Sequence, residues 1–115
     1  MEPVRHDKDW GYELWIANNN LYCGKILHFN KGKKCSWHYH KLKKETFYVQ
    51  KGKLKIWYGT DNDITKAKEI ILEVGQTFEM PVGLRHQILG LEETDMFEFS
   101  TTHFDSDSHR IIKGD

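Results

Sequence analysis

Apolar and polar residues alternate along most of the chain, in short runs rich in aromatic and branched side chains. Alternation with a period of two is typical of β-strands that have one buried face, and only residues 64–69 could form a turn of helix. The pattern predicts nine strands, at residues 12–17, 21–29, 35–40, 45–50, 54–58, 69–72, 77–80, 86–89 and 96–101. Turn residues separate these runs. We therefore expect an all-β chain that forms a single small antiparallel β-barrel.

The alternation also indicates which side chains face the inside of the barrel. Lysines at positions 53 and 55 must reach water, which turns the alternate residues of that strand inward: Leu54, Ile56 and Tyr58. From Glu45 the inner set continues through Phe47 and Val49. In residues 96–101 two arrangements fit, because either Phe97 and Phe99 face inward or Glu98 does.

Residues 35–40 place two large aromatic side chains, Trp37 and Tyr39, on the outer face of their strand. An exposed apolar patch of this kind is typical of a partner surface, and it predicts a homodimer. The alternative is that the N-terminal segment of the same chain covers the patch with Trp10 and Trp15. The tail at residues 105–115 contains two adjacent isoleucines, which predict that it docks on the barrel.

Length and composition favour one domain over residues 1–115. The 17 basic and 17 acidic residues balance, so the charge gives no reason to expect a nucleic-acid partner or an anionic membrane surface. No run of about 18 apolar residues occurs and the N-terminus is charged, so we expect a cytoplasmic protein without a membrane span. Cys23 and Cys35 are then expected to be reduced thiols, with a disulfide between them as the alternative.

Candidate chemistry begins with a pair of histidines two residues apart. His38 and His40 share the inner face of their strand with Ser36, at a separation of roughly 6 to 7 Å along the backbone. Two imidazoles at this spacing can converge on one metal ion with bonds of about 2.1 Å. Taken alone, the pair could equally be part of a solvated face.

Glycines and further polar residues extend the pair into two longer patterns. The first consists of Gly32, His38, His40, Glu45 and Gly52, and the second of Gly75, Pro81, Gly83 and His86. In type and spacing these positions resemble the two sequence motifs of the cupin superfamily. The resemblance implies a cupin-type jelly roll in which His38, His40, Glu45 and His86 bind one divalent transition metal ion. Nitrogen and oxygen ligands without thiolate suit Zn, Mn, Fe, Ni or Co.

Residues outside the motifs narrow the resemblance. Three segments are similar to the cupin domain of type II mannose-6-phosphate isomerases: the N-terminal run from Asp9 to Glu13, the run from Gly24 to Leu27 and the tail residues 105–110. This similarity implies a metal-dependent aldose–ketose isomerase with a sugar phosphate as its small-molecule substrate. Two alternatives stay open: a cupin module that holds a small anionic ligand without turnover, and an Fe(II) dioxygenase.

An isomerase also needs a base and an anion-binding group. Glu98 is the first candidate for the base and Glu79 the second, because both are carboxylates in or beside strands expected to line the cavity. For phosphate, Arg85 beside His86 offers a guanidinium with two-point contact, and a loop offers lysines at 43 and 44. Lys43 and Lys44 could also form an ordinary solvated loop.

Overall fold

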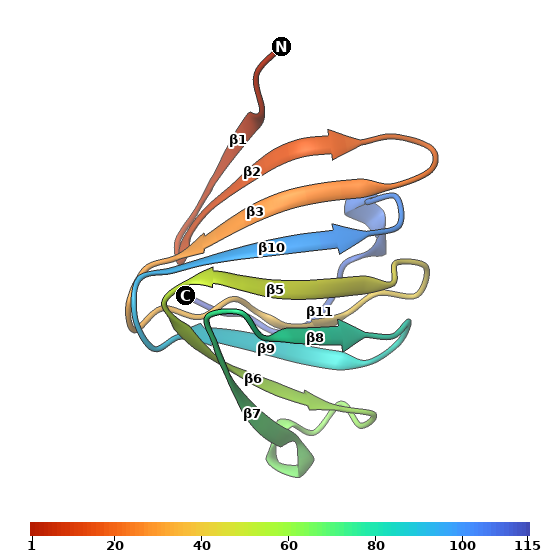
Figure 1. Ribbon diagram of the computed structural model, residues 1–115. Helices are drawn as coiled ribbons and strands as arrows, with labels where there is room; N and C mark the ends of the chain where they lie inside the picture. The colour runs from red at the N-terminus through yellow and green to blue at the C-terminus, as the bar shows by residue number, and fades with distance from the viewer.

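Two antiparallel β-sheets face each other across one core (Figure 1). A computed structural model describes all residues, 1–115, and contains eleven strands and two short 3₁₀ helices. The elements are β1 (Val4–Lys8), β2 (Gly11–Asn18), β3 (Cys23–Phe29), β4 (Trp37–Tyr39), β5 (Glu45–Lys51), β6 (Lys53–Gly59), η1 (Ile64–Lys66), β7 (Lys68–Glu73), β8 (Thr77–Met80), β9 (Arg85–Gly90), β10 (Thr94–Ser100), η2 (Asp105–Asp107) and β11 (His109–Ile112).

The strand order is β1-β2-β3-β10-β5-β8 in the larger sheet and β11-β4-β9-β6-β7 in the smaller one. Neighbouring strands are antiparallel throughout. The prediction of an all-β chain is confirmed, as are the nine strands. A 3₁₀ turn begins at Ile64, in the one segment where the sequence allowed a turn of helix, and the second turn, η2, was not predicted. The strands hydrogen-bond within two separate sheets, so the structure is a two-sheet jelly roll whose sheets are not joined into one closed cylinder.

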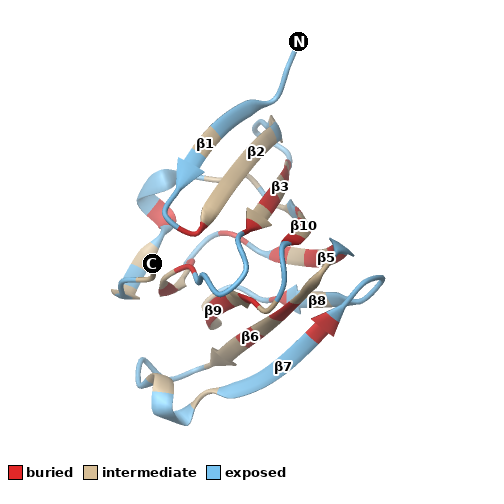
Figure 2. Cartoon of the chain, turned by 90° about the vertical axis from the view of Figure 1, so that its left-hand side faces the viewer, coloured by how far each residue is buried: buried red, intermediate tan, exposed pale blue.

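Two strands lie outside the sequence prediction, because neither has an apolar alternation of its own. β1 is rich in charged residues and mostly exposed, and it pairs with β2 at the edge of the larger sheet (Figure 2). β11 pairs with β4, with Arg110 opposite His38 and Ile112 opposite Trp37. This pairing confirms that the tail docks on the sheets, and it brings the C-terminal segment beside the histidine pair.

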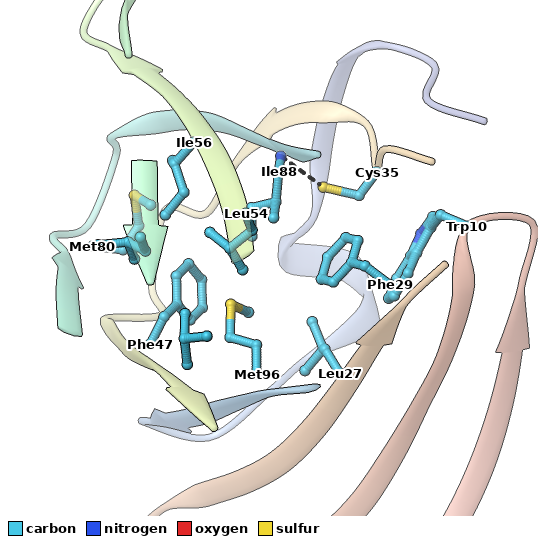
Figure 3. Packing of buried hydrophobic residues seen from close by; sticks show 12 residues of the cluster. Trp10, Leu27, Phe29, Cys35, Phe47, Leu54, Ile56, Met80, Ile88 and Met96 are labelled. Carbon is cyan, nitrogen blue, oxygen red and sulfur yellow. Dashed lines mark hydrogen bonds between the residues drawn. The ribbon is translucent and has the colours of Figure 1, made fainter. Parts of the chain in front are cut away.

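The inner faces of both sheets supply one hydrophobic core of twelve buried residues (Figure 3). Leu54 and Ile56 from β6 are fully buried, as the alternation predicts. Opposite them lie Phe47 and Val49 of β5, which are also buried. The open question in β10 is decided in favour of Glu98, which is 3% exposed and faces inward.

The aromatic pair on β4 does not form an exposed patch, so this prediction is wrong. Trp37 is fully buried, and its Nε1 donates to the backbone oxygen of Asn62 at 2.9 Å. The guanidinium of Arg85 lies 3.8 Å from the ring centroid of Tyr39, and His109 stacks on the same ring at 5.1 Å. The loop around residue 62 and β11 therefore cover Trp37 and part of Tyr39, so the pair is not the exposed apolar patch from which the dimer was predicted.

The alternative cover, the N-terminal segment, is wrong as well. Trp10 belongs to the core, where it stacks on Phe29 with ring centroids 4.3 Å apart. Trp15 lies on the other sheet, against Lys25 and His103. Neither tryptophan reaches the outer face of β4.

Cys23 and Cys35 are free, buried thiols, as predicted. Burial raises the pKa of Cys35 to about 12, so this thiol stays protonated at neutral pH. Its sulfur accepts a hydrogen bond from the backbone N–H of Ile88 at 3.3 Å. Cys35 therefore acts as a structural group that links β9 to the segment before β4. No helix in the structure has the length and apolar content that a membrane crossing requires.

Candidate metal centre

Three histidines from the smaller sheet converge on one point inside the fold. His38 lies on β4 directly opposite His86 on β9, and His40 follows two residues after His38. A nitrogen from each ring lies within 4.8 Å of the other two. His40 and His86 are 5% and 1% exposed. The i and i+2 spacing of His38 in β4 and His40 just after it, together with the cross-strand pairing with β9, produces the cluster.

The turn before His86 is tied to the histidine pair. Gly83 has a φ of +84°, a left-handed conformation that glycine adopts without steric cost. In this conformation its N–H donates to the backbone oxygen of His40 at 2.8 Å. The second motif thus places His86 by fastening its own turn to the first motif.

All three rings are oriented by the backbone through one nitrogen. In each case Nδ1 donates to a carbonyl oxygen: His38 to Ser36 at 2.9 Å, His40 to Asp107 at 3.0 Å, and His86 to Leu84 at 3.0 Å. A carbonyl can only accept, so each neutral ring carries its proton on Nδ1 and keeps the Nε2 lone pair available. This arrangement is typical of histidines that bind a metal through Nε2.

Burial keeps the three rings neutral. It lowers the pKa of His40 to about 3 and that of His86 to about 3, and it holds the pKa of His38 well below the usual value. Metal binding requires neutral imidazole, so the site is ready at neutral pH without losing protons.

Glu45 adds an oxygen to the three nitrogens. Its Oε2 lies 3.5 Å from His86 Nε2 and 3.8 Å from His40 Nε2. This oxygen is buried and has no hydrogen-bond partner in the protein. A buried carboxylate oxygen among imidazole lone pairs is unfavourable unless a cation lies between them. The donor set of three nitrogens and one oxygen therefore fits a divalent transition metal ion.

Lys43 is not part of a solvated loop. It is 3% exposed, and its Nζ lies 2.9 Å from Glu45 Oε1, 3.2 Å from Glu98 Oε2 and 3.0 Å from His103 Nδ1. Burial by itself would lower the pKa of Lys43, but the carboxylates of Glu98 and Glu45 outweigh burial and raise it. The ammonium holds Glu45 by one oxygen and leaves the other for the histidines. It is thus fully engaged, and the structure does not support Lys43 as a phosphate ligand.

Of the two carboxylates predicted as bases, only Glu98 faces the site. Its Oε2 accepts hydrogen bonds from Lys43 Nζ and, at 2.9 Å, from Ser100 Oγ. Glu79 has a side chain that is 62% exposed, and it pairs with Lys44 Nζ at 2.8 Å on the outer surface. Glu79 and Lys44 therefore lie outside the cavity.

Arg85 also points away from the histidines. Its Nε donates to Asn62 Oδ1 at 2.9 Å and one terminal nitrogen donates to the Gly83 oxygen at 2.8 Å, while its plane covers Tyr39. In a strand, neighbours face opposite sides, so an arginine next to His86 lies on the outer face when His86 lies on the inner one. The structure does not bring it to the predicted phosphate position.

Asp107 supports the site, although the motifs give no sign of it. This buried carboxylate accepts hydrogen bonds from the backbone N–H groups of Lys41, Leu42 and Lys43 at 2.8 to 3.2 Å. Burial would raise its pKa, but these backbone hydrogen bonds outweigh burial and lower it. The loop between His40 and Glu45 is therefore anchored by a residue of the C-terminal segment. Only the docking of β11 makes this contact possible.

The donor set opens into a cavity of about 630 Å³ between the two sheets. Its wall includes Glu98 and the core residues Phe47 and Ile88. It also includes several cations: Lys8, Lys25, Lys43, Arg110 and Lys113. Lys25 was not among the predicted inward residues, although the alternation of Cys23, Leu27 and Phe29 in the same strand places it on the inner face. A polar cavity of this size with both charges on its wall suits a small polar ligand.

Comparisons with known proteins agree with the fold. The model of the cupin domain matches residues 25–100. The capsular polysaccharide assembling protein CapF from Staphylococcus aureus has a TM-score of 0.80 at 22% identity, over 94% of this chain and 34% of CapF. CapF also has a crystal structure with the inhibitor 3-isopropenyl-tropolone.

Two further solved structures are similar. KdgF from Halomonas sp. has a TM-score of 0.76 at 15% identity, over 92% of this chain and 98% of KdgF. Oxalate decarboxylase from Bacillus subtilis has a TM-score of 0.79 at 16% identity, over 94% of this chain and 30% of the enzyme. The chain thus spans about a third of CapF and of the decarboxylase and nearly all of KdgF. At these identities the likeness shows the fold alone. No curated protein matches the sequence.

Proposed function

This chain belongs to the cupin domain family, and we propose that it is a metal-dependent aldose–ketose isomerase acting on a phosphorylated hexose. The observation that carries the proposal is the position of Glu98. This buried carboxylate faces the same cavity as the histidines and Glu45 without belonging to their donor set. Isomerisation needs such a group, because a base other than a metal ligand must move a proton between two substrate carbons.

Four side chains would hold the metal: His38, His40, Glu45 and His86. A divalent ion bound there acts as a Lewis acid on carbonyl and hydroxyl oxygens of the substrate. The contribution of the side chains is orientation, since the backbone fixes each histidine through Nδ1 and Lys43 fixes Glu45 through Oε1. The donors therefore converge without rearrangement.

Glu98 would take the proton from C2 of the aldose and return it to C1, while one hydroxyl proton moves from O2 to O1. Substrate and product then have the same composition. Both hydrogen bonds to Glu98, from Lys43 and Ser100, go to Oε2, which leaves Oε1 for the substrate. These two contacts hold the carboxylate in one orientation, as a positioned base requires.

The ion pair between Glu98 and Lys43 favours a second candidate function. Glu98 already accepts hydrogen bonds from the Lys43 ammonium and the Ser100 hydroxyl, so it could line the site without exchanging a proton with the ligand. The chain would then be a module that binds a small anionic ligand without turnover.

Deuterium exchange distinguishes the two functions. The metal-loaded chain is incubated with mannose 6-phosphate in D₂O, and exchange at C2 and formation of fructose 6-phosphate are followed by NMR, with and without chelator. We expect exchange that chelator abolishes. Glu98→Gln should slow exchange by roughly a hundredfold or more at unchanged metal content. Glu79→Gln is the matched control, because it removes an exposed carboxylate that pairs outside the cavity.

Absence of both C2 exchange and ketose formation with any hexose or pentose phosphate, with every first-row divalent metal, would reject the isomerase. If mannose 6-phosphate still binds under those conditions, the binding module is the function that stands. Equal loss of exchange in Glu98→Gln and Glu79→Gln would contradict the role given to Glu98.

A further inference from the structure

Lys25 on β3 is the one cation of the cavity wall that is both buried and not held between two carboxylates. The residue is 3% exposed. Lys43 is equally buried, but Glu45 and Glu98 engage it from two sides. The remaining cations of the cavity are exposed: Lys8, Arg110 and Lys113. Lys25 therefore differs in kind from every other cation around the cavity.

The ammonium of Lys25 has only weak partners within the protein. Its Nζ lies 3.4 Å from Glu13 Oε1 and 4.2 Å from the ring centroid of Trp15. The same Glu13 oxygen also accepts a hydrogen bond from Trp15 Nε1 at 2.9 Å. An ammonium has three N–H donors, so one long hydrogen bond and one ring face leave donors unused. Unused donors on a buried charge are unfavourable, and an anionic oxygen would satisfy them.

The location of Lys25 relates it to the rest of the site. β3, β10 and β5 lie side by side (Figure 1). Lys25 is opposite Glu98 on β10, and Glu98 is opposite Phe47 on β5. Neighbouring strands are about 4.8 Å apart, which puts Lys25 about 10 Å from the strand that carries Glu45. Glu98 therefore lies between Lys25 and the strand that carries Glu45, on the wall that faces the histidines.

We propose that Lys25 binds the acidic group of the substrate, a phosphate or a carboxylate, while the opposite end of the same sugar lies at the metal centre. The proposal rests on the proposed function for the identity of the sugar. It gives the anion a place that Arg85, Lys43 and Lys44 do not supply, because none of them offers an unengaged cation to the cavity. The acidic group would compete with Glu13 for the ammonium.

Binding, measured without turnover, tests the proposal. Isothermal titration compares mannose 6-phosphate, glucuronate and mannose, with the metal-loaded and the metal-free chain. The indole N–H resonance of Trp15, assigned with Trp15→Phe, reports the site because that ring contacts both Lys25 and Glu13. We expect at least one of the two acids to bind more tightly than mannose and to shift this resonance. The acid that does so identifies the group as phosphate or carboxylate.

Three variants, expected to weaken, leave unchanged or tighten binding of the acid, test the role of Lys25. Lys25→Gln should weaken binding of the acid by about ten- to a hundredfold and leave mannose binding unchanged. Lys8 is an exposed lysine of the same cavity, so Lys8→Gln should change neither the affinity for the acid nor the affinity for mannose. Glu13→Gln keeps Lys25, removes its competitor and should tighten binding of the acid, so it tests the proposal even if Lys25→Gln does not fold.

Two results would overturn the proposal. The first is equal affinity of the parent chain for the acids and for mannose. The second is unchanged affinity for the acid in Lys25→Gln or Glu13→Gln. Failure of the isomerase is a separate outcome, since a chain that binds mannose 6-phosphate through Lys25 without C2 exchange refutes the reaction and keeps the anion site.

Discussion

Replacement of Lys43 by methionine tests the charge cluster beneath the metal centre. Lys43, Glu45 and Glu98 are each 3% exposed, and Lys43 is the cation that both carboxylates share. Methionine is unbranched and of similar length, so the substitution removes the charge with little change in packing. Two buried carboxylates then lie on one wall without their counter-ion. Loss of one partner of a buried ion pair typically costs about 3–5 kcal/mol, and we expect a loss of this size in the metal-free chain.

A bound metal should reduce the loss. A divalent ion at the histidines gives Glu45 a new counter-charge, whereas Glu98 keeps only its hydrogen bond from Ser100. The free energy of unfolding, measured by urea denaturation with and without the ion, should therefore fall less in the loaded chain. The pKa of Lys43 is raised above its ordinary value of 10.5, so its stabilising effect is complete below that pH and is lost only at higher pH.

Lys44→Met is the matched control for this experiment. Its ammonium pairs with Glu79 on the surface, where both side chains are more than half exposed, and such pairs contribute less than about 1 kcal/mol. If Lys43→Met loses no more stability than Lys44→Met, the buried cluster does not hold the site as described. An equal loss with and without metal would contradict the link between the cluster and the donor set.

Three further predictions concern stability. Because burial lowers the pKa of His40 and His86 to about 3 while the unfolded chain titrates near 6.5, the unfolded state binds more protons between these values. The metal-free chain should lose about 1.4 kcal/mol per pH unit for each histidine as the pH falls through this window, and a flat profile from pH 7 to 5 in urea denaturation would contradict it. Asp107→Asn should lower the free energy of unfolding by about 1–3 kcal/mol and weaken metal binding, because the loop before Glu45 loses a charged acceptor. If calorimetry gives the parent's unfolding free energy and metal affinity, Asp107 does not anchor the loop. Trp37→Ser should lower the free energy of unfolding by about 3–5 kcal/mol, since Trp37 is fully buried, and should leave the molecular mass in light scattering unchanged. A shift from dimer to monomer would place Trp37 in a dimer interface after all.

The alternation of the sequence was sufficient to predict the inner wall of the fold. Phe47 and Val49 follow Glu45 at a period of two, and all three are buried. The i and i+2 spacing of His38 and His40 gave their shared face in the same way. Periodicity of this kind is local, so it can be read without knowledge of the partner strands.

Features that depend on long-range pairing could not be predicted. Lys43 lies in a loop with other lysines and reads as a solvated residue, until β10 places Glu98 within reach of its Nζ. Trp37 reads as an exposed aromatic because its cover, the loop at Asn62, is distant in sequence. Asp107 lies 67 residues from His40 in sequence and is brought to it only by the docked tail.

Metal content tests whether the three histidines and Glu45 bind one divalent ion. Elemental analysis of the purified chain, after incubation with each first-row divalent metal and removal of excess, gives the metal bound per chain. His28→Ala is the control, because His28 pairs with Asp95 at 2.7 Å, away from the donor set. A site made by these four ligands predicts about one ion per chain in the parent and in His28→Ala, and only a small residual amount of metal in His86→Ala. A parent chain that binds no ion, or a His86→Ala chain that binds as much as the parent, would contradict it.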